Sequence, residues 1–200
     1  MSSQQLYIKA GEISIVDASV IQAKQNRPNK GLDGNSTQDQ EAGYNVKTSS
    51  DGKQKTTYGF KAPIAVEEDG FIKASVFTAG NIHDSQCLAP LLSGEESSVY
   101  ADSAYQSERH DALLAARGSK NGILERAYRN KPLTDAQKRR NRQHSGIRSM
   151  VERVLGVLKL HDGMGQARYL GLVRNFTRFG LILKKAVNLI PKCTFERKLA

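Results

Sequence analysis

Three carboxylates lie in stretches of the sequence that are otherwise mostly apolar. Asp17 interrupts an apolar run of β-branched residues, Asp102 lies near the end of a second such run, and Glu152 lies in a stretch with helical spacing. A carboxylate among apolar residues is unfavourable unless it is paired, hydrogen-bonded or bound to a metal ion. Singly, each is most simply a structural hydrogen-bonding group. Together, the three require a shared explanation.

The spacing around Glu152 places two cations beside it on one helical face. At about 100° per residue, Arg148, Glu152 and Lys159 fall within about 40° of one another, whereas the apolar residues of 147–158 occupy about 180° to 340°. The simplest interpretation is an i, i+4 ion pair between Arg148 and Glu152, worth a few tenths of a kcal/mol. The alternative is a carboxylate that points into a cleft, with the two cations holding phosphates that approach it.

The positive charge of the chain is concentrated in its second half. The net charge is +10 over 200 residues; residues 1–100 hold 9 Lys+Arg against 12 Asp+Glu, and residues 101–200 hold 21 against 8. Such a localised field favours a polyanionic partner, above all nucleic acid. An anionic membrane surface is disfavoured because the Arg-rich stretch lacks a bulky apolar face. The residues expected to contact the DNA backbone are Lys138, Arg139, Arg140 and Arg142.

Composition excludes several other classes of protein. The length suits one ordinary domain or one domain with an appendage. No apolar run approaches the roughly 18 residues of a membrane span, and the N-terminus lacks a secretory pattern, so we expect no membrane partner and a cytoplasmic location. Cys87 and Cys193 have no metal-type spacing, which argues against a zinc site or a disulfide scaffold.

The first half of the chain predicts three strands of one sheet. Residues 12–23 are rich in β-branched residues and predict a buried strand. Residues 24–57 have a polar composition that predicts a long loop. The runs at 58–68 and 71–80 are separated by Asp69-Gly70, which predicts a β-hairpin.

The middle of the chain predicts alternating helices and short strands. Asn81 is expected to cap a helix that ends near Gly94. Residues 97–105 predict a strand that carries Asp102, and residues 121–127 suggest a further strand. Between them, we expect a helix capped by Ser107 and closed by Gly118.

The last third predicts helices. Thr134 and Gln137 form a capping-box pattern that begins a strongly basic helix. A second helix is expected from about Ser145 to Leu160, and residues 168–190 again have helical spacing. The whole order predicts an α/β fold, with a mixed sheet covered by helices.

Five short segments between 13 and 159 form a pattern of fixed order and spacing. They are VDAS at Asp17, YGFKAPIAV at 58–66, TAGNIHDS at 78–85, YADSAY at Asp102, and R-x3-E-x6-K at Arg148, Glu152 and Lys159. In this pattern the chain resembles the catalytic domain of the DDE transposases of bacterial insertion sequences, specifically the insertion sequence five group.

The resemblance implies a ribonuclease H-like fold and a metal-dependent site. Asp17, Asp102 and Glu152 correspond to the catalytic acidic ligands of two Mg²⁺ or Mn²⁺ ions, and Arg148 and Lys159 to cations that contact phosphates. The implied activity is phosphodiester cleavage and strand transfer on double-stranded DNA, both transposon terminal repeats and target DNA. A homodimer on DNA is expected.

The same resemblance divides the chain into a catalytic domain and an appendage. Residues 1–165 would form the ribonuclease H-like DDE domain, with the polar loop 24–57 inserted after the first strand. Residues 166–200 would form a C-terminal helical extension packed on that domain.

Two departures from the family pattern bear on activity. Ser145 stands where the family signature has a Tyr, and the first strand begins close to Met1 although such transposases carry an N-terminal helical region. We therefore expect the catalytic portion of a longer protein, or a shortened reading frame. The alternative function is a truncated, catalytically idle DNA-binding fragment that modulates full-length transposase. A third interpretation is a general nuclease of the same fold.

Overall fold

A mixed β-sheet forms the centre of the molecule in the computed structural model, which describes residues 12–24, 39–48, 51–128 and 132–187. The sheet order is β2-β3-β1-β6-β7, with β4 and β5 pairing on β3. β1 runs parallel to β6, and β6 parallel to β7, while the β2, β3, β4 and β5 pairings are antiparallel. The strands are β1 (Ile13–Gln22), β2 (Gly43–Thr48), β3 (Gln54–Val66), β4 (Ile72–Ser75), β5 (Thr78–Ala79), β6 (Ser98–Ala101) and β7 (Lys120–Asn121).

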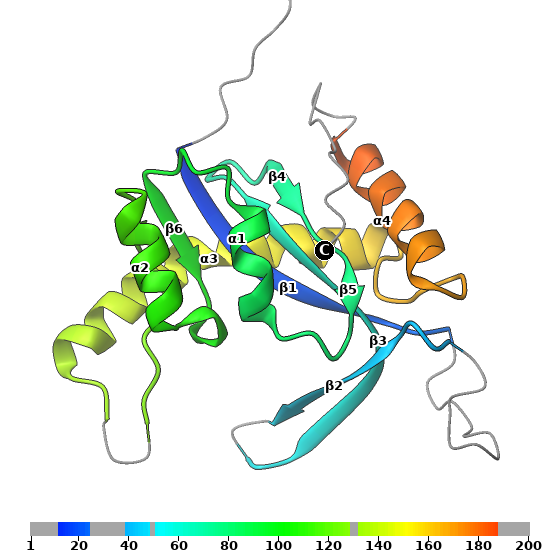
Figure 1. Cartoon of the computed structure of the whole chain (residues 1–200), viewed down its shortest axis with the longest axis horizontal. Helices are drawn as coiled ribbons and strands as arrows, with labels where there is room; N and C mark the ends of the chain where they lie inside the picture. Colours follow the sequence, from blue (N-terminus) through cyan, green and yellow to red (C-terminus); the bar gives the residue numbers. More distant parts are fainter. Residues whose placement is uncertain (1–11, 25–38, 49–50, 129–131, 188–200) are drawn as a thin grey trace, which may run out of the picture.

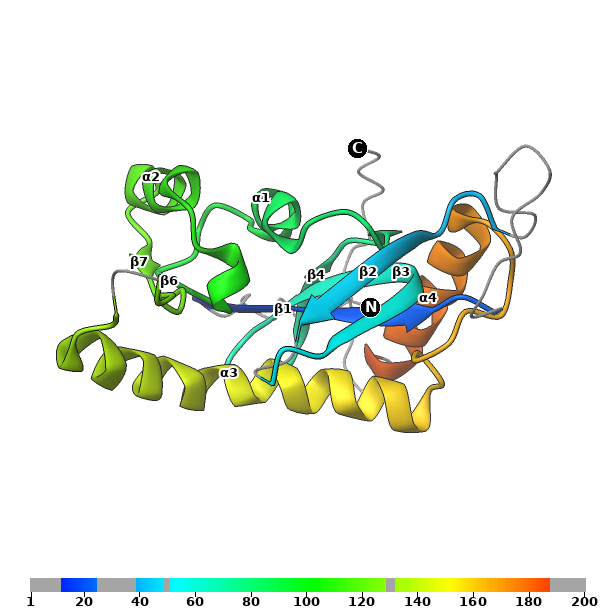
Figure 2. The same ribbon diagram turned by 90° about the horizontal axis from the view of Figure 1, so that it is seen from below.

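Helices cover both faces of this sheet, so that the molecule has three layers (Figure 2). On one face lie α1 (Leu88–Leu91) and α2 (Glu108–Ala116), and on the other lies α3 (Asp135–His161). α4 (Leu172–Val187) lies at one end of the sheet and packs into the apolar cluster on the α3 face. Short 3-10 helices span Asp84–Cys87 and Ser103–Tyr105. The predicted α/β fold, a mixed sheet flanked by helices, is confirmed.

Two apolar clusters, one on each face, hold the layers together. On the α3 face, Ile15 and Phe60 from the sheet pack in one cluster with Leu155 and Leu158. On the α1 face, Val16 belongs to a second cluster that includes residues of α1 and α2. Alternate residues of β1 therefore serve opposite cores, as expected for a strand buried on both faces.

Several local predictions are confirmed. The turn between β3 and β4 places Gly70 at a φ of 85°, a left-handed conformation that glycine adopts without strain. Thr134 and Gln137 form the capping box at the start of α3. Ser107 caps α2, which is followed by Gly118 at a φ of 67°.

The prediction of a continuous polar loop over 24–57 is wrong in part. Residues 43–48 form β2, and β3 begins at Gln54 rather than at Tyr58. β2 and the first part of β3 pair mainly with each other and not with a buried surface, so their side chains can be polar. Their composition therefore gives no strand signal. Residues 25–38 and 49–50 lie outside the described part of the chain.

The predicted break between two helices near Ser145 is also wrong. α3 is one helix of 27 residues, and Gly146 lies within it. A glycine inside a helix costs up to about 1 kcal/mol. The helix continues because Thr134 caps its start and Val151, Leu155 and Leu158 bury its second half against the sheet.

Two smaller corrections concern caps and strand length. His83, not Asn81, caps the helical segment that begins at Asp84, and its ring nitrogen accepts a hydrogen bond from the Ser85 amide. The strand suggested at 121–127 is only the short β7, Lys120–Asn121.

The middle part of the predicted appendage, Leu172–Val187, is helical. α4 contributes Phe179 and Leu183 to the cluster on the α3 face, and residues 188–200 lie outside the described part. The division into a domain and an extension stays a prediction. Within the described ranges, every helix is too short or too polar to cross a membrane.

Candidate active site

Strand register brings the first two carboxylates to neighbouring positions. β1 and β6 pair in parallel, with Val16 opposite Ala101, so Asp17 and Asp102 are the next residues on adjacent strands. The amide of Ala18 donates to Asp17 Oδ1 at 2.8 Å, and the amide of Ser103 donates to Asp102 Oδ1 at 2.7 Å. Each aspartate is therefore oriented by the amide of the residue that follows it.

Arg148 lies among all three carboxylates. Its Nη2 is 3.8 Å from Asp17 Oδ2 and 3.4 Å from Glu152 Oε1, and its Nη1 is 3.8 Å from Asp102 Oδ1. We call Asp17, Asp102, Glu152 and Arg148 the carboxylate cluster. The structure thus brings together side chains from β1, the end of β6 and the middle of α3.

Burial within the carboxylate cluster is uneven. The Arg148 side chain is 9% exposed, compared with 24% for Asp17, 45% for Asp102 and 58% for Glu152. Arg148 Nε is buried and has no hydrogen-bond partner among the described residues. The cation therefore forms the floor of the cluster, and Asp102 and Glu152 face solvent.

The most buried of the three carboxylates is also electrostatically unsatisfied. Burial raises the pKa of Asp17 above its ordinary value, and the negative charge of Asp102 adds to this effect. The Ala18 amide, Arg148 and Lys47 oppose the rise but do not cancel it. Three carboxylates surround one guanidinium, so the cluster holds more negative charge than its own cation neutralises, which favours additional cations.

The chemistry of these side chains suits a hard divalent cation. Carboxylate oxygens are the ligands that Mg²⁺ and Mn²⁺ prefer, and Asp17, Asp102 and Glu152 offer only such oxygens. As they stand around Arg148, no three acidic, His or Cys side chains among the described residues are close enough together to share one ion. The oxygen donors are of the type that a divalent ion prefers, but in this structure they surround the Arg148 guanidinium and are not arranged to share one ion.

The other cations named from the sequence lie outside the carboxylate cluster. Lys159 is exposed two helical turns beyond Glu152. Arg139 and Arg142 are exposed in the first half of α3 and have no ion-pair partner among the described residues. Two further cations there are engaged, since Lys138 pairs with Asp135 at 3.1 Å and Arg140 pairs with Glu125. The first half of α3 is thus an exposed basic surface.

A partly buried ion pair on the α1 side of the sheet was not predicted. Lys61 Nζ lies 2.9 Å from Asp84 Oδ1 and donates to the Ile82 carbonyl at 2.8 Å. The buried Tyr105 hydroxyl has no described partner, and burial raises its pKa, with Asp84 and Asp17 adding to the rise. The signal available in the sequence was Lys61 itself, a single charge within the apolar run YGFKAPIAV.

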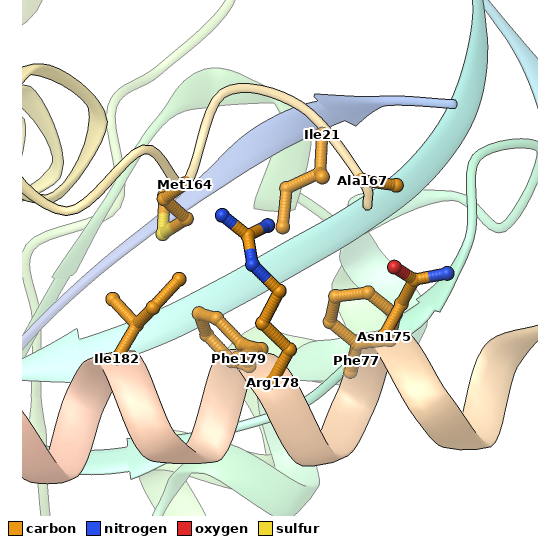
Figure 3. Close-up of a pocket in the computed structure, with 8 residues that line it drawn as sticks. All are labelled: Ile21, Phe77, Met164, Ala167, Asn175, Arg178, Phe179 and Ile182. Carbon is orange, nitrogen blue, oxygen red and sulfur yellow. The ribbon is translucent and has the colours of Figure 1, made fainter. Parts of the chain in front are cut away.

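A small pocket elsewhere is separate from the carboxylate cluster. It lies between α4 and the end of β1 (Figure 3). Arg178 crosses it and donates to the backbone carbonyls of Gln166 and Gly163 at 2.7 Å and 2.8 Å. None of the cluster residues lines it; the lining residues are Ile21, Phe77, Met164, Ala167, Asn175, Arg178, Phe179 and Ile182.

Comparison with known proteins gives a consistent result over most of the chain. Residues 9–189 match the family model described as the transposase DDE domain. A protein named transposase for insertion sequence element IS1106, from Neisseria meningitidis serogroup B, is 28% identical over 185 residues. That alignment covers 87% of this chain and 63% of the relative, so the chain spans less than two thirds of that protein's length.

Proposed function

The chain belongs to the family of transposase DDE domains, and we propose that it is the catalytic portion of a DNA transposase of an insertion sequence. In this proposal it cleaves phosphodiester bonds at transposon ends and joins them to target DNA. Assignment to the insertion sequence five group, a homodimer on DNA and a cytoplasmic site of action belong to the same proposal.

The arrangement of the carboxylate cluster is the observation that carries this proposal. Asp17, Asp102 and Glu152 come from separate parts of the chain, yet all lie within 3.8 Å of one guanidinium. One guanidinium can neutralise only one of three carboxylates, so a purely structural role leaves the other two negative charges uncompensated. The same convergence suits a site that gathers cations for phosphoryl transfer.

Divalent ions would be held by Asp17, Asp102 and Glu152. When bound, two such ions activate the attacking hydroxyl group and stabilise the leaving oxygen of an in-line displacement. The amides of Ala18 and Ser103 keep the two aspartates oriented toward this space. No side chain of the chain is required as a nucleophile.

The cations of α3 would hold the DNA. Arg148 neutralises part of the cluster's negative charge, which reduces repulsion between the carboxylates and an approaching phosphate. Arg139, Arg142 and Lys159 are exposed and supply positive potential on either side of Glu152 along the helix. This charge acts on any DNA sequence, because phosphate contacts carry no base information.

A cleavage assay tests the proposal. Labelled DNA that carries the ends of the insertion sequence is incubated with the chain and Mg²⁺ or Mn²⁺, and nicked products are measured. Asp102→Asn should lower the rate on the order of a thousandfold, because it weakens a ligand contribution of several kcal/mol. Asp111→Asn, the same substitution on exposed α2, should leave the rate unchanged.

The other outcomes identify the alternatives. DNA binding that is insensitive to metal, with no nicking by the wild-type chain, contradicts the enzyme and supports the idle DNA-binding fragment. Nicking with no preference for transposon ends supports a general nuclease. Equal loss of activity in Asp102→Asn and Asp111→Asn contradicts the assignment of the site.

A further inference from the structure

A two-stranded hairpin projects away from the three-layered body. Residues 43–48 of β2 and 51–58, which include the first part of β3, form what we call the hairpin arm, at the lower edge of Figure 1. β2 pairs with no described strand except β3. From Val46 to Thr56, every described residue of the arm is exposed. An isolated two-stranded ribbon is marginally stable in water, so packing does not explain why the chain forms this arm.

Like charges face each other across the arm. Lys47 and Lys55 are directly opposite in the antiparallel register, an arrangement that destabilises a strand pair. Neither forms an ion pair with a described residue, whereas the nearby Lys53 pairs with Asp51 at 3.6 Å. Two adjacent unpaired cations on an exposed ribbon are unfavourable in the free protein and become favourable when a polyanion binds.

The two faces of the arm differ in chemistry. Side chains alternate along a strand, so Lys47 and Lys55 share one face with Asn45, while Tyr44 and Val46 lie on the other. The Tyr44 and Tyr58 rings are in contact in a tilted arrangement, with ring centroids 4.7 Å apart. The aromatic pair supports the ribbon from one side, which leaves the opposite side as a polar, positively charged surface.

The position of the arm relates it to the carboxylate cluster. β3 continues from the arm into Gly59–Val66, which pair with β1, the strand that carries Asp17, so the arm extends the same sheet that holds the carboxylate cluster. The exposed basic first half of α3 directly precedes Arg148 and Glu152 on the same long helix. A duplex whose backbone reaches the cluster would therefore meet positive charge from the arm as well as from α3.

We propose that the hairpin arm is a DNA-backbone-binding element, in which Lys47 and Lys55 contact phosphates of the duplex held at the carboxylate cluster. The inference rests on the proposed function for the identity of the polyanion. It adds a second, separate contact surface that composition did not reveal, since residues 1–100 carry a net negative charge. The contact is independent of DNA sequence, because lysine acts on phosphate as a point charge.

Binding to a random-sequence duplex, measured in chelator over a range of salt concentrations, tests the arm without any cleavage step. Replacing both lysines (Lys47→Gln with Lys55→Gln) should weaken binding roughly tenfold at low salt. It should also reduce the slope of log affinity against log salt by about 1.8, from about 0.9 per phosphate contact. The conservative pair Lys47→Arg with Lys55→Arg should retain the wild-type slope.

A matched control removes two charges elsewhere. Arg117 on the α2 side and Lys184 on α4 are exposed and have no ion-pair partner among the described residues. The pair Arg117→Gln with Lys184→Gln should leave the slope unchanged. Thermal stability distinguishes a binding role from a structural one, because removing opposed like charges should leave the melting temperature the same or raise it.

The outcomes separate this inference from the proposed function. An unchanged salt slope in the Lys47/Lys55 variant overturns the proposal that the hairpin arm binds DNA and does not affect the catalytic proposal. An equal change in the Arg117/Lys184 control, or a lower melting temperature that accounts for the loss, also overturns it. A wild-type chain that binds DNA through the arm but never cuts contradicts the catalytic proposal alone. A wild-type chain with no salt-dependent DNA binding overturns both.

Discussion

Asp17 and Glu96 are two carboxylates close to β1 whose surroundings shift their pKa values in opposite directions. Burial raises the pKa of Asp17, and one backbone amide with two cations only partly opposes it. Burial also acts to raise the pKa of Glu96, yet hydrogen bonds from Ser93 and Gly94 outweigh it and lower the pKa. Asp17 therefore has too few partners to offset its burial, whereas the hydrogen bonds to Glu96 more than offset the burial of Glu96.

The donors around Glu96 explain its structural role. The amide and the hydroxyl of Ser93 donate to Oε1 at 2.7 Å and 2.9 Å, and the Gly94 amide donates to Oε2 at 2.9 Å. Ser14 of β1 also donates, at 3.3 Å, which ties the turn to the sheet. Glu96 thus fixes the turn that leads into β6, and with it the position of Asp102.

Glu96 is a charged residue with a structural role, whereas the charges of the carboxylate cluster are available for chemistry. Neutral groups supply four hydrogen bonds to Glu96, from Ser14, Ser93 and Gly94. The carboxylate cluster is held by one guanidinium at 3.4 to 3.8 Å, and excess negative charge remains. Functional sites characteristically retain such unsatisfied charge. Three substitutions test the contrast.

Removing the central cation should have the largest effect on stability. Arg148→Met leaves three carboxylates around an apolar side chain, and we expect the free energy of unfolding in chelator to fall by about 3 kcal/mol. Urea unfolding measures this loss. Added Mn²⁺ should restore part of it, because an ion that binds only the folded state stabilises that state.

The matched substitution for Arg148 lies on the same helix. Arg153 is exposed and has no described ion-pair partner, so Arg153→Met should change stability by less than about 0.5 kcal/mol. If both variants lose the same stability, the cluster is not held together by Arg148.

Glu96 should show a smaller, pH-dependent effect. The folded pKa lies below the ordinary value of 4.5, so the ionised carboxylate stabilises the fold above that pH, and the contribution is lost as the pH falls through the folded pKa. We expect Glu96→Gln to cost about 2 kcal/mol at neutral pH. Urea unfolding of the variant and the wild-type protein should converge below pH 4.5. A cost that persists unchanged in acid would mean that packing, not charge, is responsible.

Asp17 should show the smallest effect and the opposite sign. Its raised pKa means that the ionised form is disfavoured in the folded protein, and at neutral pH that form opposes folding. Asp17→Asn should therefore raise the free energy of unfolding in chelator by about 1 kcal/mol, as measured in urea at neutral pH. A loss comparable to that of Glu96→Gln would show that Asp17 is equally well satisfied, which would remove the contrast.

Local signals were sufficient for much of the fold. The β-branched run around Asp17, the Asp69-Gly70 turn and the Thr134–Gln137 capping box each act within a few residues, and each is present in the structure. The helical angles also placed Arg148 and Glu152 at one edge of the buried face. Parallel pairing of the strands that carry Asp17 and Asp102 then puts those residues side by side.

Features that depend on distant contacts were missed. β2 is too polar to be identified as a strand, since its partner Gln54–Tyr58 supplies the hydrogen bonds that define it. The continuity of α3 across Gly146 depends on burial of Val151 and Leu155 against the sheet. The Lys61–Asp84 pair likewise joins β3 to a helical segment more than twenty residues away.

The sequence by itself determined most of the element types, the basic character of α3 and the identity of the three carboxylates. Only the tertiary structure decided that Arg148 is buried at their centre rather than exposed beside a single partner, and that two lysines of a polar segment face each other on a projecting ribbon. Periodicity reports which side of an element is buried, because that depends on neighbours along the chain. The energy of a charge depends on every group within a few ångströms, and folding brings those groups from all parts of the chain.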